Sequence, residues 1–157
     1  MYPLSSKNVN KETEEAIYFF TPAFHPLDNF SAHMISLWGK KFPTAEHAYQ
    51  WKKFSASNPA IAQQILAASS PHRVKEISDQ HQDEVLPLWH KKKVAIMKEI
   101  LQAKANQHED VREALKRTGT RTIIENSPVD NFWGAGPNGK GENWVGKIWM
   151  EIRESLL

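Results

Sequence analysis

Cysteine is absent from the 157 residues of the sequence. Its absence excludes disulfides, thiolate nucleophiles and zinc sites built on cysteine, and it fits a reducing compartment. Long apolar runs are also absent, and none approaches the roughly 20 residues that a membrane-spanning helix needs. Residues 1–15 are polar and contain no apolar segment of the kind that a secretory signal requires. We therefore expect a cytoplasmic protein that does not contact a membrane.

An excess of charge of either sign is missing too, because the formal net charge is only +2. Bulk electrostatics therefore do not predict nucleic-acid binding, and a polyanionic partner would need a local group of basic residues. The candidates are Lys40-Lys41, Lys52 and Lys91-Lys92-Lys93. Consecutive lysines fan around a helix, so the triplet is interpreted as a solvated face. The six tryptophans indicate an aromatic core and leave open a site for a flat ligand.

Several catalytic and metal-binding motifs are missing. The seven histidines show neither H-x-x-x-H nor H-E-x-x-H spacing, and the sequence has no G-x-S-x-G elbow and no P-loop. Gly134–Gly139 matches G-x-G-x-x-G, but Pro137 and the missing βαβ unit exclude a dinucleotide fold. The loop that leads to Asn143 is either an anion site at a helix N-terminus or a surface loop. We expect no metal ion and no cofactor.

Local signals predict an α+β protein that is mainly helical, with a small sheet of short strands. Ser, Thr, Asn and Pro residues mark the helix starts, with Asn143 as the cap of the last helix. Short apolar runs and a Gly39-Lys40 turn mark the strands. We expect a flexible leader at residues 1–15 and a single domain at residues 16–157. The expected helices cover 45–54, 59–68, 71–80, 87–107, 110–118 and 144–155, and the expected strands cover 16–21, 33–38, 41–42 and 121–125.

The helix expected after Thr44 carries an informative polar stripe. Glu46, Gln50 and Lys53 recur at i, i+4 and i+7, so they share one side of the helix. That side faces either water or a pocket, and spacing alone favours water. His47, next to Glu46, is interpreted as a hydrogen-bonded core residue rather than a metal ligand.

The other candidates combine carboxylates with aromatic side chains. A carboxylate activates water or stabilises an oxocarbenium-like centre, and aromatic faces hold a flat heterocycle. This combination suits hydrolysis of a bond to a heterocycle. Alternatively, the tryptophans are core residues and the carboxylates are surface charges. The set comprises Asp28, Asn29, Phe30, Glu46, Lys53, Trp89, Glu125, Asp130, Trp133 and Asn143.

Ordered blocks from about Phe19 to Leu157 resemble the NADAR family. Leu27-Asp28-Asn29-Phe30 resembles the family's leucine-serine-asparagine-phenylalanine signature, with Asp28 in place of serine. Residues 43–50, followed by Lys53-Phe54, match the next block. The middle helix keeps Trp89, Lys93, Met97 and Lys104, and the last block keeps Thr118-Gly119, Glu125, Ser127-Pro128, Asp130, Trp133-Gly134, Gly136, Gly141, Asn143, Gly146 and residues 150–153.

The resemblance implies a compact α+β domain that cleaves N-glycosidic bonds without a metal. It implies that Glu46 is the lead catalytic carboxylate and that Asp130 orients ribose or water. Lys53 would contact a phosphate or, with a lowered pKa, attack the anomeric carbon as an amine. The implied substrate contacts are Asn29, Phe30, Trp89, Glu125, Trp133, Gly134 and Asn143.

Members of the family act on early riboflavin-pathway intermediates or remove ADP-ribose from guanine bases in nucleic acid. Others were proposed to bind NAD-derived ligands. The resemblance therefore implies a small nucleotide-like substrate or an ADP-ribosylated nucleic acid, with non-catalytic binding of NAD or ADP-ribose as a third interpretation. The first is favoured, because it needs only a pocket. Asp28 adds a negative charge that disfavours a phosphate beside it. The sequence does not indicate an oligomeric state.

Overall fold

The computed structural model describes residues 10–20 and 25–156, and these residues form six α-helices and five short strands. The α+β class, mainly helical with short strands, is thereby confirmed, although the strands form two small sheets rather than one. The chain divides into two compact units. We call Asn29–His108 the central unit, and Met1–Asp28 with Glu109–Leu157 the terminal unit. Each is described by itself, and the predicted single domain at residues 16–157 stays a prediction.

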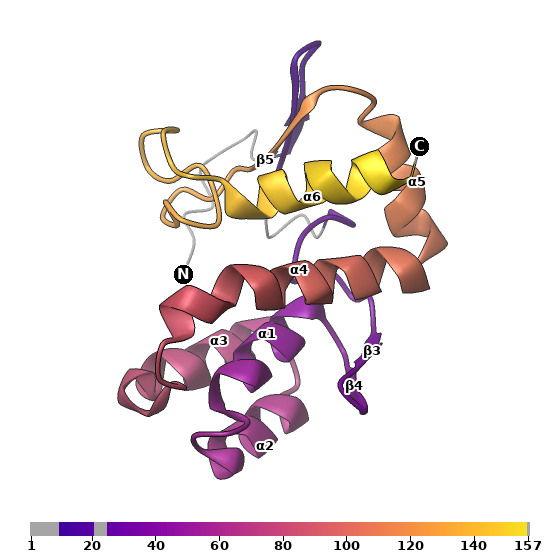
Figure 1. Cartoon of the computed structure of the whole chain (residues 1–157). Coiled ribbons are helices and arrows are strands. Elements are labelled where there is room, and N and C mark those ends of the chain that lie inside the picture. Colours follow the sequence, from indigo (N-terminus) through magenta and orange to yellow (C-terminus); the bar gives the residue numbers. More distant parts are fainter. Residues whose placement is uncertain (1–9, 21–24, 157) are drawn as a thin grey trace. The chain divides into compact units, whose positions relative to one another are not determined.

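The sheet of the terminal unit joins strands from both ends of the chain (Figure 1). Strand β2 (Ala16–Phe19) pairs in parallel with β5 (Thr122–Glu125) and antiparallel with β1 (Lys11–Glu12). The strands expected at 16–21 and 121–125 are confirmed at Ala16–Phe19 and Thr122–Glu125, but the predicted bounds are wrong at Phe20 and Arg121, which lie outside the strands, and Thr21 lies outside the described residues. Strand β1 lies inside the stretch expected to be a leader, and residues 1–9 lie outside the described part of the chain.

The described residues of the terminal unit also form two helices, α5 (Glu109–Arg117) and α6 (Trp144–Ser155). Helix α6 packs closely on β5, because Gly146 has no side chain there: an added Cβ would overlap the carbonyl oxygen of Ile123. Trp149 is fully buried on this helix, and its Nε1 donates to the carbonyl oxygen of Leu27 at 2.9 Å. A glycine at position 146 therefore sets the distance between helix and sheet.

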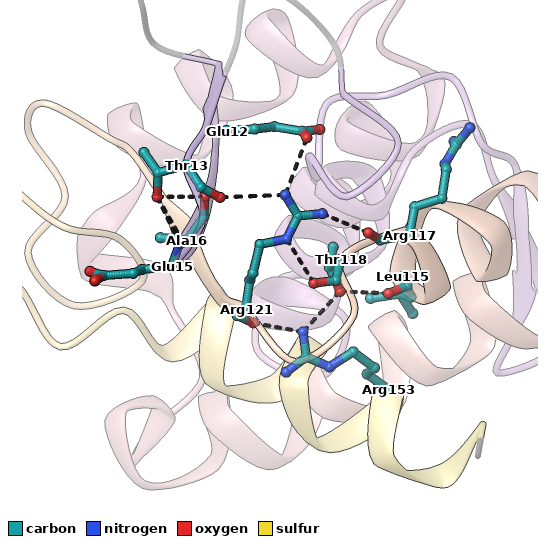
Figure 2. A network of polar contacts seen from close by, with 9 residues as sticks. All are labelled: Glu12, Thr13, Glu15, Ala16, Leu115, Arg117, Thr118, Arg121 and Arg153. Carbon is teal, nitrogen blue, oxygen red and sulfur yellow. Dashed lines mark hydrogen bonds and ion pairs between the residues drawn. The ribbon is translucent and has the colours of Figure 1, made fainter.

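Arg121 connects the end of α5 to β1 (Figure 2). Its guanidinium donates to the carbonyl oxygens of Arg117 at 2.7 Å and Thr118 at 3.0 Å. It also contacts the Glu12 carboxylate at 3.3 Å and the Thr13 carbonyl oxygen at 3.4 Å. The last carbonyl groups of a helix have no partner within the helix, so a guanidinium satisfies them well. The side chain thus caps α5 and holds β1 beside it.

The central unit contains four α-helices, a 3₁₀ turn and a hairpin. The helices are α1 (Ala45–Phe54), α2 (Pro59–Ala67), α3 (Pro71–Gln80) and α4 (Trp89–Gln107), and Gln82–Glu84 form the 3₁₀ turn. The predicted caps are confirmed for the first three helices: the side chains of Thr44, Asn58 and Ser70 each accept a hydrogen bond from a backbone N–H of the first turn. Phe54 and Ile65 are fully buried in the core between α1, α2 and α3. Within the described ranges, no helix is long and apolar enough to cross a membrane.

The hairpin pairs β3 (Ile35–Leu37) with β4 (Lys40–Phe42). The turn predicted at Gly39-Lys40 is wrong by one residue, because the structure places it at Trp38-Gly39 with φ of +52° and +73°. Two-residue hairpin turns of type I′ need positive φ at both central residues, which a tryptophan rarely adopts. The Trp38 ring stacks on Trp51 with centroids 6.1 Å apart, and this packing holds the residue in its unusual conformation.

Candidate active site

The polar stripe of α1 is largely buried. Glu46 is 7% exposed and Gln50 is 5% exposed, while Lys53 is half-buried. The solvent-facing stripe favoured by spacing alone is therefore wrong at Glu46 and Gln50. A carboxylate and an amide at these positions require polar partners, because a buried polar group without a hydrogen bond is costly.

Glu46 is held by contacts with the backbone and with the next turn of the helix. Its N–H donates to the carbonyl oxygen of Asn29 at 3.1 Å, which fixes the start of α1 against the preceding segment. Its Oε1 accepts from Nε2 of Gln50 at 2.7 Å. The position in the first turn also places the carboxylate at the positive end of the helix dipole. The Glu46 carboxylate is thus oriented before any substrate binds.

Lys53 lies two turns further along α1, where its ammonium contacts the face of Tyr49 at 5.2 Å from the ring centroid. Burial lowers the pKa of Lys53 below its ordinary value. The Glu46 carboxylate raises this pKa, and the charge of Lys75 lowers it further, but burial is the largest effect. A lowered pKa increases the share of neutral amine, and this is the property required of an amine nucleophile.

Two aromatic candidates are also in the central unit. Trp89 is 8% exposed, and its Nε1 donates to the Tyr49 hydroxyl at 3.2 Å. The ring of Phe30 meets the edge of His72, with centroids 4.9 Å apart and planes at 89°. Both rings are held by other side chains of the protein. Their burial therefore fits a role in the core as well as a role as an aromatic wall of a substrate site. Their contact with a substrate stays a prediction.

His47 occupies the buried side of α1, as its core interpretation predicts. Its Nδ1 lies 2.8 Å from the Thr44 hydroxyl, and its Nε2 lies 3.0 Å from the carbonyl oxygen of Ala68. Burial lowers the pKa of His47, while the hydrogen bond with Ala68 raises it. The hydrogen-bonded core role is confirmed, and the imidazole connects the start of α1 to the end of α2.

In the terminal unit, Asp130 organises the loop that follows β5. Its Oδ1 accepts from the N–H groups of Phe132 at 2.9 Å and Trp133 at 2.8 Å. Trp133 is half-buried and meets the ring of Phe132 edge-on, with centroids 4.8 Å apart. One carboxylate oxygen of Asp130 is therefore used to shape the loop. The predicted catalytic role of Asp130 stays a prediction.

Asn143 binds strand β5 instead of capping α6. Its Oδ1 accepts from the N–H of Glu125 and its Nδ2 donates to the carbonyl oxygen of Ile123, both at 2.9 Å. Among the described residues it makes no capping hydrogen bond to its own helix, so the predicted cap is wrong. The backbone explains the difference, because Asn143 has φ of +54°, whereas a capping residue is usually extended.

The glycine-rich loop that leads to Asn143 is also hydrogen-bonded to strand β5. A Cβ on Gly134 would lie 2.7 Å from the backbone oxygen of Glu125, and the next residue, Ala135, donates its N–H to that oxygen at 2.8 Å. The N–H groups of Trp144 and Val145, at the start of α6, donate to loop carbonyl oxygens at 3.1 and 3.0 Å. These N–H groups are thus already bonded, and the anion site considered for this helix end is not supported.

A cavity of about 390 Å³ opens in the terminal unit. Of the described residues that line it, none is a predicted site residue. Arg121, one of its lining cations, donates its hydrogen bonds to protein oxygens, as Figure 2 shows. We therefore do not assign the active site to this cavity. The lining residues are Glu12, Ile17, His25, Ala114, Arg117, Thr118 and Arg121.

The predicted site residues fall into two groups of five. The central unit contains Asn29, Phe30, Glu46, Lys53 and Trp89, and the terminal unit contains Glu125, Asp130, Trp133, Gly134 and Asn143. One backbone hydrogen bond connects Glu46 to Asn29 in the first group. Glu125 has direct contacts with Asn143 in the second. Sequence reasoning did not select Gln50 as a site residue, although its i+4 spacing from Glu46 was a usable signal.

Comparison with known proteins identifies the family. A model of the NADAR domain matches residues 10–157, and the chain belongs to this family. A protein of Nostoc punctiforme named N-glycosidase Npun_R5314 is 36% identical over 143 residues, which cover 89% of this chain and 92% of that protein. N-glycosidase YbiA of Escherichia coli is 31% identical over 150 residues, which cover 96% and 92% of the two chains.

A solved structure and a riboflavin-related protein extend this comparison. The solution structure of E. coli YbiA matches with a TM-score of 0.79 and 30% identity, covering 96% of this chain and 89% of that one. The chain therefore has the same fold as E. coli YbiA. A Vibrio vulnificus protein named riboflavin biosynthesis protein VVA0006 is 32% identical over 145 residues, and these cover 91% of this chain but 39% of that longer protein.

Proposed function

We propose that the chain hydrolyses the N-glycosidic bond of a ribosylamino-pyrimidine phosphate, an early intermediate of riboflavin synthesis. The enzyme class, a hydrolase of N-glycosyl compounds, follows from membership of a family whose similar members are named N-glycosidases. The choice of substrate is supported by the relative that is named a riboflavin biosynthesis protein. The expected cytoplasmic location stays a prediction.

The observation that carries the proposal is the arrangement on α1. A buried carboxylate, oriented by Gln50, shares one helix face with a half-buried lysine whose pKa is lowered. Seven residues separate Glu46 from Lys53, which is about 10 Å along the helix axis at 1.5 Å per residue. This separation places one group at each side of a ribose phosphate that lies along the stripe.

Two mechanisms use these groups. In the first, Glu46 takes a proton from water as the water oxygen bonds to the anomeric carbon, and the departing nitrogen takes a proton from solvent. Lys53 then contacts the phosphate. In the second, the neutral amine of Lys53 bonds to the anomeric carbon as the bond to the base breaks, and the proton that the amine loses passes through solvent to the departing nitrogen. The glycosylamine so formed opens its sugar ring to an imine as the ring oxygen takes a proton, and water hydrolyses the imine to release the sugar and the free amine. The lowered pKa of Lys53 supports the second mechanism, because it increases the share of neutral amine.

Product analysis tests the proposal. Purified protein is incubated with a ribosylamino-pyrimidine phosphate and, separately, with DNA that carries ADP-ribose on guanine, with and without EDTA. We expect mass spectrometry to show release of the pyrimidine, unaffected by EDTA. Tight nucleotide binding with no turnover of either substrate would instead favour a non-catalytic NAD or ADP-ribose-binding module. Loss of turnover in EDTA would contradict the metal-free mechanism.

A second candidate, removal of ADP-ribose from guanine bases in nucleic acid, has one observation in its favour. Lys40 and Lys41 are exposed on the hairpin of the central unit. Lys52 places its ammonium 4.5 Å from the centroid of the Trp38 ring. Cations beside aromatic rings are typical of surfaces that bind single-stranded nucleic acid. Turnover of the modified DNA in the assay above would select this candidate.

A further inference from the structure

The side chain of Gln50 has an acceptor that the protein does not use. Its Nε2 donates to Oε1 of Glu46 at 2.7 Å, and this bond fixes which end of the amide is oxygen. Exchange of the two ends would place the amide oxygen against the carboxylate, where both atoms carry negative charge. Gln50 is 5% exposed, and its Oε1 is fully buried with no hydrogen-bond partner among the described residues.

A second acceptor of the same kind lies next to the start of α1. Asn29 is 7% exposed, and its Nδ2 donates weakly to the sulfur of Met97 at 3.6 Å. Its Oδ1 is also buried and has no partner in the part of the chain that the structure describes. The backbone oxygen of Asn29 accepts from the N–H of Glu46. Gln50 and Asn29 are therefore both bonded directly to Glu46, Gln50 through its side chain and Asn29 through its backbone.

Buried acceptors without a partner, on residues that are bonded to Glu46, suit a ligand that donates hydrogen bonds. Burial of such an oxygen costs free energy that only a donor recovers, so the site favours hydroxyl or amine groups over further acceptors. The amide oxygen and nitrogen of Gln50 are bonded to one carbon, which keeps Oε1 close to the Glu46 carboxylate. If Glu46 serves the anomeric carbon of a ribose, the nearest donor on the ligand is the hydroxyl on the adjacent carbon.

We propose that Gln50 is a specificity-determining residue that accepts a hydrogen bond from the 2′-hydroxyl of the substrate, so that the enzyme selects ribosyl over 2′-deoxyribosyl compounds. This inference rests on the proposed N-glycosidase function, and it identifies the 2′-hydroxyl as the part of the sugar that is recognised beside Glu46. A 2′-deoxyribosyl ligand leaves the buried oxygen of Gln50 unpaired, and a site built to bind a hydroxyl strongly rejects the analogue that lacks it.

Binding of two sugar phosphates tests the inference without any turnover. Titration calorimetry is carried out with D-ribose 5-phosphate and 2-deoxy-D-ribose 5-phosphate on the wild-type protein and on Gln50→Met. We expect the wild type to prefer ribose by about tenfold or more, the effect of one unpaired buried acceptor, and Gln50→Met to lose most of this preference. The control is Gln64→Met, because Gln64 is exposed on α2.

Equal binding of the two sugars by the wild type would overturn the inference, and so would an unchanged preference in Gln50→Met. If a water molecule, rather than the sugar, donates to Gln50, the wild type binds the two sugars equally. Rates add an independent measurement: kcat/KM is compared for a ribosylamino-pyrimidine phosphate and its 2′-deoxyribosyl counterpart. For each substrate, kcat/KM of the wild type is divided by kcat/KM of Gln50→Met. The intrinsic reactivity of the sugar is the same in both values and therefore cancels.

The rate comparison also separates two roles of Gln50. If Gln50 only orients Glu46, Gln50→Met lowers both rates by the same factor, and the specificity inference fails. If Gln50 accepts a hydrogen bond from the 2′-hydroxyl, Gln50→Met lowers the rate on the ribosyl substrate more than the rate on the 2′-deoxyribosyl substrate. Absence of turnover by the wild type would refute the proposed function alone, because the binding preference still decides the role of Gln50.

Discussion

Asn143 and Glu125 are joined by a hydrogen bond of 2.9 Å from the Glu125 N–H to the Asn143 side chain, although 18 residues separate them. The other end of the same amide donates to Ile123, so one side chain bonds two alternate residues of β5. Asn143 also has φ of +54°, a region that asparagine tolerates better than most residues. The residue thus joins the loop, the start of α6 and the sheet.

Replacement of Asn143 is expected to lower the stability of the fold. Asn143→Gly removes two hydrogen bonds but keeps the backbone conformation, which predicts a loss of about 1–3 kcal/mol in the free energy of unfolding. Asn143→Ala adds the strain of a left-handed residue, about 1 kcal/mol more. Urea denaturation measures both variants. Wild-type stability in both, together with a raised KM, would instead support the predicted substrate contact of Asn143.

Glu46→Gln is expected to reduce turnover by about 10²-fold or more, because the variant cannot accept a proton or stabilise positive charge at the anomeric carbon. The amide keeps the volume of the side chain, so the melting temperature should change little. Glu99→Gln, at an exposed position of α4, is the matched control. A folded Glu46→Gln protein with a near-normal rate would remove Glu46 from the mechanism.

Lys53→Ala is expected to cost far more activity than Lys91→Ala or Lys92→Ala. Lys53 is half-buried beside Tyr49, whereas Lys91 and Lys92 are exposed on α4, as predicted. The third lysine of the triplet, Lys93, is half-buried, so the predicted solvated face is wrong at that residue. Borohydride added during turnover identifies the role of the amine. Substrate trapped on Lys53 shows a nucleophile, and inactivity without trapping indicates an electrostatic contact. Normal turnover by Lys53→Ala would exclude both roles.

His47 is expected to make the fold sensitive to acid. Burial lowers the pKa of His47, so below about pH 6.5 the unfolded chain takes up a proton that the folded protein does not. The free energy of unfolding should therefore fall as the pH falls from that value toward the lowered pKa. Urea denaturation between about pH 7.5 and 5.5 tests this. We expect a shallower pH dependence in His47→Gln than in His90→Gln, whose side chain is exposed; equal slopes would contradict the prediction.

Helix starts could be predicted from the sequence because cap chemistry is local. Thr44, Asn58 and Ser70 each satisfy an N–H within their own first turn, so a few residues decide the outcome. The turn at Trp38 could not be predicted in this way, because stacking on Trp51 holds its positive φ. Strand β1 has two exposed residues and no apolar pattern, so only its pairing with β2 reveals it.

In the candidate site, too, features that depend on contacts between distant parts of the sequence could not be predicted. Spacing placed Glu46, Gln50 and Lys53 on one helix face, but periodicity does not say what covers that face. Burial of Gln50 and the lowered pKa of Lys53 arise from residues distant in sequence, and so they required the structure. Asn143 was expected at the start of α6, and it lies there, yet its partners are on β5. The roles of Asp130 and the aromatic residues stay predictions.

The parallel pairing of β2 with β5 also has a consequence for how the chain folds. Ala16 lies opposite Thr122, so the pairing closes a loop of more than 100 residues. Such long closures form slowly, because the chain loses much conformational entropy before the strands gain any contact. The hairpin and helices of Asn29–His108 are contiguous in sequence and can form while the ribosome is still making the C-terminal segment. We therefore expect the central unit to fold first. The edge of β2 that pairs with β5 should stay unpaired until β5 has been synthesised.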